Sequence, residues 1–299
     1  MRAAFAPVLL VLCAATVGAQ EAVSLKWTLK EGTNFFAKSV TDMDMTMQLL
    51  NMDVDMKMKV TAVQRFKVLS VKPGASKVEL SIQKMDMEMT SDKLPGGIPG
   101  LGAIGERVKG TTLTATLDDK LAVTKLEGYE KFVEKLAGDD EMLGKQMKQQ
   151  FSEESLKQMF SQVFAFAPDK PVKIGETWTR TDKMPAAGLE AVVKQKYKLD
   201  SVSNGVAKIG LTGDLTFQAG KAFPGLPEGV DIKKFDMKAD KFTSTLYFDT
   251  KAGRLTENKM DMDLMGDISM ALGGQTIDMT MKIKARQTTT ISDKNPVVD

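Results

Sequence analysis

The sequence has no histidine and one cysteine, Cys13, so most of the side chains that bind zinc or act as catalytic base and nucleophile are missing. Carboxylate and Ser-Lys chemistry remain, but no motif identifies an activated group. We therefore expect no enzyme activity, no catalytic or metal-ligating residues and no cofactor. A carboxylate-based hydrolase stays open as an alternative, because Asp and Glu together number 39.

An excess of either charge is also missing, since 41 basic residues face 39 acidic ones. The sequence therefore lacks the basic surface typical of a nucleic-acid-binding protein, and we expect no nucleic-acid partner. Beyond the first residues, no run reaches the roughly 20 apolar residues that span a bilayer. We expect no transmembrane helix.

The first residues, 1–19, predict a cleavable secretory signal peptide. Arg2 provides the positive n-region, residues 3–17 are apolar, and the small residues of Val17-Gly18-Ala19 favour cleavage after Ala19. A lipid anchor on Cys13 is the alternative. We expect a protein of the periplasm or cell envelope, or an extracellular one. Cleavage would remove the only cysteine, so no disulfide could stabilise the mature chain.

Alternation of apolar and polar residues predicts strands through most of the chain, most clearly over 43–60, with a reversal near Leu50-Asn51. The register that places Leu49 opposite Met52 puts methionines on one face. On the other face it pairs opposite charges, Asp44 with Lys57 and Asp42 with Lys59. Ion pairing explains these repeated Asp-Met-Asp segments better than a calcium site does.

Residues 260–286 repeat this pattern around a turn at Gly273-Gly274. Placing Leu272 opposite Gln275 again brings opposite charges together, Asp263 with Lys284 and Asp261 with Arg286. Shorter stretches predict further strands at 66–71, 78–89, 111–116, 121–124, 191–199, 206–217 and 242–248. The apolar phase slips within 78–89, which predicts a bulge near Gln83-Lys84.

Helical spacing interrupts the strands between residues 126 and 170. Tyr129 to Leu136 predict one helix that ends at Gly138, and a second could follow Asp140. Ser152 is the expected N-cap of a third helix. Its apolar stripe comprises Leu156, Met159, Phe160, Val163 and Phe164.

Residues 100–105 match the Gly-x-Gly-x-x-Gly pattern of dinucleotide-binding proteins. That motif needs a strand before it and a helix whose N-terminus holds the pyrophosphate. We expect a flexible loop here instead. The apolar segments 95–99 and 224–227 are also expected to be long loops.

We expect a mainly β (α+β) fold whose antiparallel meanders form curved, barrel-like sheets in two possibly related halves with a short helical insert between them. The expected division is a signal peptide (1–19), an N-terminal β-rich half (20–125), a helical insert (126–170), a C-terminal β-rich half (171–292) and a disordered tail (293–299). Two sequence echoes suggest related halves: 55–62 with 278–285, and 30–35 with 173–178.

Residues 171–178, Pro-Val-Lys-Ile-Gly-Glu-Thr-Trp, follow the third predicted helix. This P-V-x-x-G-x-x-W motif resembles a family of uncharacterised exported bacterial proteins that carry a domain of unknown function. The resemblance covers most of the mature chain and implies a β-rich fold with a central helical insert. It brings no catalytic or ligand-binding residues with it.

Methionine is unusually abundant, with 21 residues against 14 phenylalanines. Methionine surfaces adapt to ligands of varied shape, so we expect a noncatalytic envelope protein that binds an apolar ligand or a protein partner. A purely structural envelope role, with methionines filling the core, is an alternative. Weak thioether binding of copper(I), for instance by Met45, Met56 and Met58, is another.

Overall fold

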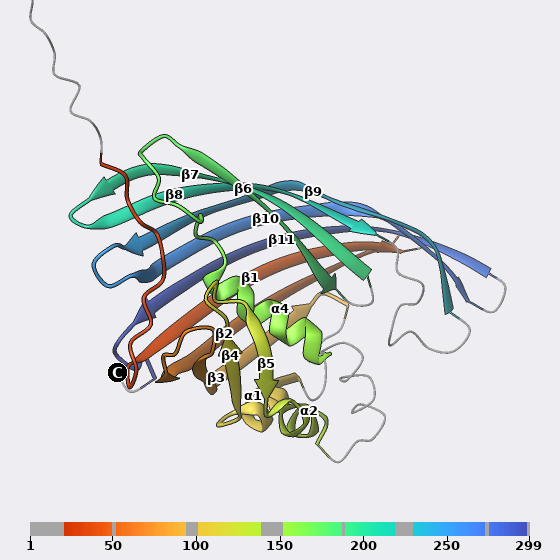
Figure 1. Cartoon of the computed structure of the whole chain (residues 1–299). Helices are drawn as coiled ribbons and strands as arrows, with labels where there is room; N and C mark the ends of the chain where they lie inside the picture. Colours follow the sequence, from red (N-terminus) through yellow and green to blue (C-terminus); the bar gives the residue numbers. More distant parts are fainter. Residues whose placement is uncertain are drawn as a thin grey trace, which may run out of the picture.

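Long strands pair into one antiparallel sheet of eleven strands, in the order β5-β4-β3-β2-β1-β11-β10-β9-β8-β7-β6 (Figure 1). The computed structural model describes residues 21–49, 52–93, 101–138, 152–186, 189–218, 230–272 and 275–297. The strands are β1 (Asn34–Leu49), β2 (Met52–Ser70), β3 (Ser76–Ser91), β4 (Thr112–Leu117), β5 (Val123–Glu127), β6 (Thr177–Ala186), β7 (Leu189–Ser203), β8 (Val206–Gln218), β9 (Val230–Asp249), β10 (Arg254–Leu272) and β11 (Gln275–Ser292). The described helices are α1 (Leu101–Val108), α2 (Tyr129–Ala137) and α4 (Glu153–Phe164).

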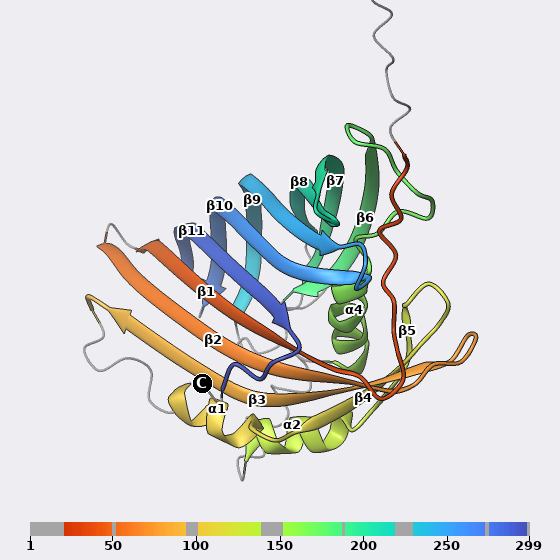
Figure 2. The same ribbon diagram turned by 90° about the vertical axis from the view of Figure 1, so that its left-hand side faces the viewer.

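Strands that follow one another in the chain pair with each other, except β5 and β6, and the first and last strands, β1 and β11, pair in the middle of the sheet. The sheet stays open because β5 and β6 are its two edges. Figure 2 shows it curving around α4. The prediction of a mainly β fold with curved antiparallel meanders and a short helical insert is confirmed.

The gap between the edge strands β5 and β6, which we call the seam, is bridged by α4, because this helix contacts both of them. Ser152 caps α4 as expected, accepting a hydrogen bond from the Ser155 amide at 3.1 Å. Of the predicted stripe, Leu156, Phe160 and Phe164 are buried and Val163 is partly buried against the core. Met159 is 55% exposed, so its place in the stripe was wrong.

The P-V-x-x-G-x-x-W motif fixes the path of the chain from α4 into β6. Val172 is buried and pairs with Val23 of the N-terminal segment. The Trp178 indole N–H donates to the carbonyl of Phe166 at 2.9 Å, just beyond the end of α4. The guanidinium of Arg180 donates to the neighbouring carbonyl of Ala165. Two side chains of β6 thus hold the C-terminal end of the helix.

The echo between residues 30–35 and 173–178 corresponds to two turns with the same hydrogen bonds. The Gly32 amide donates to Val68, and the Gly175 amide donates to Leu199. Both glycines have positive φ, 77° and 89°. In each turn the residue after the glycine also donates back three positions, to Lys30 or Lys173. This likeness supports related halves, although both halves contribute to a single sheet.

Both predicted hairpin registers are confirmed, with Leu49 opposite Met52 and Leu272 opposite Gln275. The turns at residues 50–51 and 273–274 lie outside the described residues. The bulge is confirmed too, because Val63 pairs with Lys84 and Gln64 with Ile82, leaving Gln83 unpaired.

Two elements differ from expectation. Residues 101–108 form α1 rather than a flexible loop, because Ile104 and Val108, one helical turn apart, pack into the core beside β3. Strand β6 was not predicted, since Arg180 and Asp182 occupy its inward positions and hide the alternation. The signal peptide, the helix after Asp140 and the loops at 95–99 and 224–227 lie outside the described residues.

The domain limits themselves stay a prediction. Asp293, at the start of the predicted tail, accepts two hydrogen bonds of 2.6 Å from Arg254.

None of the helices in the described part of the chain is long and apolar enough to cross a membrane.

The paired turns give a test of the fold. Neither Gly32 nor Gly175 has an atom within 4 Å of the place where a Cβ would stand, so alanine would cause strain through its positive φ alone. We expect Gly32→Ala and Gly175→Ala each to lower the free energy of unfolding by about 1–2 kcal/mol. Urea unfolding followed by circular dichroism measures this.

Asparagine tolerates this conformation better, so the matched Gly→Asn variants should lose less. Alanine variants as stable as the parent chain would contradict a left-handed backbone at these turns.

Candidate functional site

The concave face of the sheet carries alternate residues of each strand, which on β1 are the odd-numbered residues from Phe35 to Met47. At one end this face is closed by a packed aromatic core. Phe35 stacks on Phe66 with their ring centroids 4.9 Å apart. Trp27 of the N-terminal segment contacts Phe164 of α4 edge to face, with a centroid distance of 5.1 Å. This end leaves no room for a ligand, since its large side chains are almost fully buried.

The other end of the concave face is only partly filled. On the side of β7 to β10, a second buried cluster contains Val193, Leu215, Met237, Leu264 and Ile268. Methionines of β10 and β11, among them Met262 and Met281, pack against it. Some of the methionine therefore serves as ordinary core.

Seven methionines of β1, β2 and the outer half of β3 belong to neither cluster. They are half-buried and follow the concave face outward: Met43, Met45, Met47, Met56, Met58, Met87 and Met89. We call this surface the methionine trough. The bulge at Gln83 brings β3 into it, because without the extra residue the β3 methionines would face the other way.

Uncharged polar side chains form a belt between the aromatic core and the trough. Ser39 and Thr289 share a hydrogen bond of 2.8 Å, and Ser244 donates to Asn258. One row outward from Ser39, Thr289 and Asn258, Thr41 lies opposite Gln287 at the inner end of the trough, and Ser244 stands in this same row beyond Met260. All six side chains are half-buried.

Charged side chains are absent from the concave face of β1, β2, β10 and β11 over the described stretches 35–47, 52–68, 258–270 and 277–291. On β6 the concave face carries Arg180 and Asp182, which are bonded to each other at 2.8 Å. Nearby, Tyr197 donates to Gln195 at 2.8 Å and stacks on Trp178, and burial raises the pKa of its phenol.

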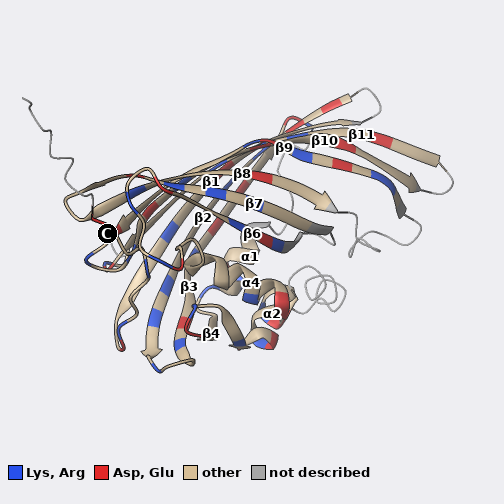
Figure 3. Ribbon diagram, turned by 45° about the horizontal axis from the view of Figure 1, so that its top comes forward, with Lys and Arg blue, Asp and Glu red and all other residues tan. Residues whose placement is uncertain are grey.

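The register places charged residues of both signs on the convex face. Figure 3 shows acidic and basic residues intermixed along the strands. All four predicted charge pairs are in register. Among these four, the pair that closes to ion-pair distance in the described structure is Asp261 with Arg286, at 3.5 Å. Lys241 of β9 lies 3.9 Å from the same carboxylate. Exposed pairs of this kind contribute little to stability.

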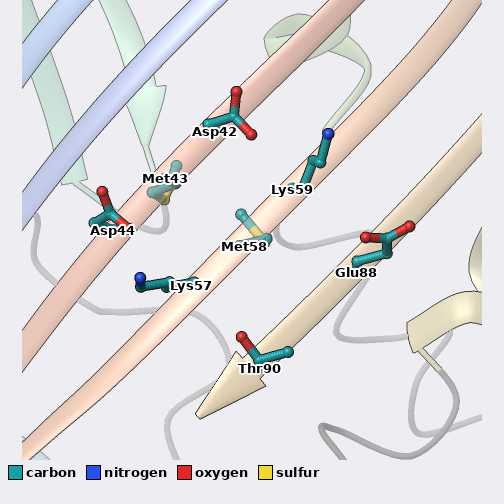
Figure 4. Close-up of a pocket in the computed structure, with 8 residues that line it drawn as sticks. All are labelled: Asp42, Met43, Asp44, Lys57, Met58, Lys59, Glu88 and Thr90. Atoms are coloured by element: carbon teal, nitrogen blue, oxygen red, sulfur yellow. The ribbon is translucent and has the colours of Figure 1, made fainter.

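A shallow depression on this face, drawn in Figure 4, holds no metal site. Its polar lining consists of Asp42, Asp44, Lys57, Lys59, Glu88 and Thr90, with Met43 and Met58 beneath. In the described part of the chain, no three Asp, Glu, His or Cys residues gather closely enough to hold a metal ion.

Glu127, Asp267 and Asp293 have lowered pKa values because of hydrogen bonds from Lys125, Thr280 and Arg254 respectively. Lowered values suit ion pairing rather than proton donation.

The sequence placed the copper candidates correctly on one face, with Met45 directly opposite Met56. Met58 lies between Met43 and Met89 in the next row across three strands. Sequence reasoning overlooked the polar belt. Its signal was present, because Thr41 and Gln287 interrupt runs that are otherwise apolar at alternate positions.

Comparison with solved structures finds a similar chain in the structure described as "lipid-protein interactions in lipovitellin". The two share 8% identity and a TM-score of 0.50, over 89% of this chain and 25% of that one. This chain thus spans about a quarter of its length. The outer membrane protein OprG from Pseudomonas aeruginosa matches at 8% identity over 90% and 99% of the two chains, but its TM-score of 0.27 is too low to bear on the fold.

A search of curated proteins finds no matching sequence. A family model does match residues 64–255, which include strands of both halves, the helical insert and the P-V-x-x-G-x-x-W motif. The model describes a family of unknown function, and it covers more than half of the chain. The chain therefore belongs to the DUF6263 family.

Proposed function

We propose that this chain is an exported, noncatalytic protein that binds the apolar part of a lipid-like ligand in the methionine trough. The observation that carries the proposal is the half-burial of methionines that join neither packed cluster. Side chains of a filled core would be buried, whereas side chains of an ordinary exposed face would be mostly polar.

The dimensions of the trough suit one hydrocarbon chain. Six residues of β1 separate Thr41 from Met47, which at strand rise is about 20 Å, and the three strands that carry the trough, β1, β2 and β3, span about 10 Å. The acyl region of one bilayer leaflet is about 15 Å deep.

The chemistry of the trough supports an apolar occupant. Its thioether side chains are flexible and polarizable, so they can pack against chains of different length and branching. No charged side chain shares this face on β1 or β2 in the described residues, so an apolar chain would meet no group that loses hydration without a partner.

The fold is compatible with this role. The lipovitellin structure, which shares the fold at a TM-score of 0.50, is described by its lipid–protein interactions. The match shows common architecture and leaves the ligand of this chain as our proposal. The trough residues themselves carry the argument.

Export and the lack of catalysis rest on the sequence. Residues 1–19 have the pattern of a signal peptide, and a chain cleaved after Ala19 would contain neither histidine nor cysteine. Such a chain would lack the usual bases and nucleophiles. We place the protein in the periplasm or envelope, or outside the cell.

Export predicts a defined mature mass. Full-length protein expressed in a bacterial host should be recovered outside the cytoplasm as a chain that begins at Gln20, as measured by intact mass spectrometry. An Ala19→Leu variant should retain residues 1–19, because signal peptidase needs a small residue there. A parent chain that stays cytoplasmic and unprocessed would contradict export, and an acylated N-terminal Cys13 would favour the lipid anchor.

Ligand binding predicts an effect that depends on the face of the sheet. The uncharged dye N-phenyl-1-naphthylamine should bind the parent protein with increased fluorescence. Met47→Lys should weaken this binding at least tenfold, because the ammonium group would enter the trough. Gln48→Lys adds the same charge at the next position, which is exposed on the convex face, and should leave binding unchanged.

Two outcomes would count against the trough. Equal loss in both lysine variants would place the dye elsewhere or reflect unfolding, which circular dichroism detects. No dye binding by the parent, together with no copurified lipid in native mass spectrometry, would favour the purely structural role.

Copper(I) is a second candidate because one row holds Met43, Met58 and Met89 at directly opposite positions on three strands. Thioethers suit this soft ion. A copper(I) titration under reducing conditions should then show stoichiometric binding that Met58→Leu abolishes. Met265→Leu, on the opposite face, should retain it. No binding by the parent chain would remove this candidate.

A further inference from the structure

Two polar side chains at the inner end of the trough have no hydrogen-bond partner among the described residues. Thr41 of β1 and Gln287 of β11 lie directly opposite each other in the middle of the sheet. Both are half-buried, and neither side chain makes a hydrogen bond or other polar contact with the described residues. Neither side chain is among the fully buried polar groups of the described residues that lack a partner. The hydroxyl of Thr41 and the amide of Gln287 therefore remain accessible from the trough.

The next row inward behaves differently. There, Ser39 bonds to Thr289 at 2.8 Å. Asn258, opposite Thr289 in the same row, accepts a hydrogen bond from Ser244, which lies beyond Met260 in the row of Gln287. Unlike these side chains, Thr41 and Gln287 keep unused hydrogen-bonding capacity where the belt meets the methionines.

The surroundings of this pair decide which ligand group it suits. Val60 lies opposite Thr41 on β2, and Met260 lies opposite Gln287 on β10, so apolar side chains flank the pair on both sides. A hydroxyl and an amide offer donors and acceptors without charge. An ionised group here would lose water without gaining a counter-charge, because the nearest concave-face cation on the described β6, Arg180, is already bonded to Asp182.

We propose that Thr41 and Gln287 bind the uncharged polar end of an amphiphile, a hydroxyl, ester or amide as in an acylglycerol, while its chain runs outward along the trough to Met47. This inference rests on the proposed function and adds the class and orientation of the ligand. The polar end lies against the closed aromatic core, and the end of the chain points to the open rim.

Competition against N-phenyl-1-naphthylamine tests the proposal. The competitors are 1-monolauroylglycerol and laurate, which share one acyl chain, at pH 8 where laurate is ionised. The parent protein should bind the monoglyceride at least tenfold more tightly than laurate. The double variant Thr41→Val, Gln287→Met should reduce that preference to less than threefold.

Thr288→Val is the matched control, because Thr288 neighbours Gln287 but faces the convex side, and it should keep the full preference. Equal binding of the two competitors by the parent, or a preference retained by the double variant, would overturn this inference and leave the trough intact. Absence of dye binding by the folded parent would overturn the proposed function and this inference together. Circular dichroism of each variant separates these outcomes from misfolding.

Discussion

The whole arrangement depends on two strands that do not pair. Strands β5 and β6 are the edges of a sheet whose order would otherwise run in a circle, and α4 lies between them. The helix is held there by carbonyl groups at its C-terminal end, to which Trp178 and Arg180 of β6 donate. Because the helix takes the place of a ladder of hydrogen bonds, the sheet stays wide enough to have an inner surface.

Two kinds of packing divide that surface. Around α4 and the N-terminal segment, aromatic rings fill the space and provide the burial that stabilises the fold. Beyond the polar belt, the long strands extend past the helix, and only the side of β7 to β10 finds partners for its apolar side chains. The methionines of β1 to β3 are left half-exposed. This is the surface that the proposed ligand would cover.

Much of this could be predicted from the sequence where two signals agreed. In both hairpins the methionine alternation and the opposite charges pointed to the same register, and the structure has it. The bulge at Gln83 was readable as a slip in phase. Strand β6 could not be predicted, because the inward-facing Arg180 bonds to the end of α4 and so breaks the alternation of apolar and polar residues. The open state of the trough could not be predicted either, since a methionine reads the same whether it fills a core or lines a groove.

The pairing of β1 with β11 has a consequence for the order of events in folding. Ser39 and Thr289, which bond across this pair, are 250 residues apart in the chain. Contacts so distant in sequence are slow to form, because a long loop must close before they are gained. Each half can pair its own strands early, but the centre of the sheet joins only after the last strand has been made. Until β11 is in place, β1 and β10 are unpaired edges rich in methionine, so the chain is most prone to aggregation before this strand has paired.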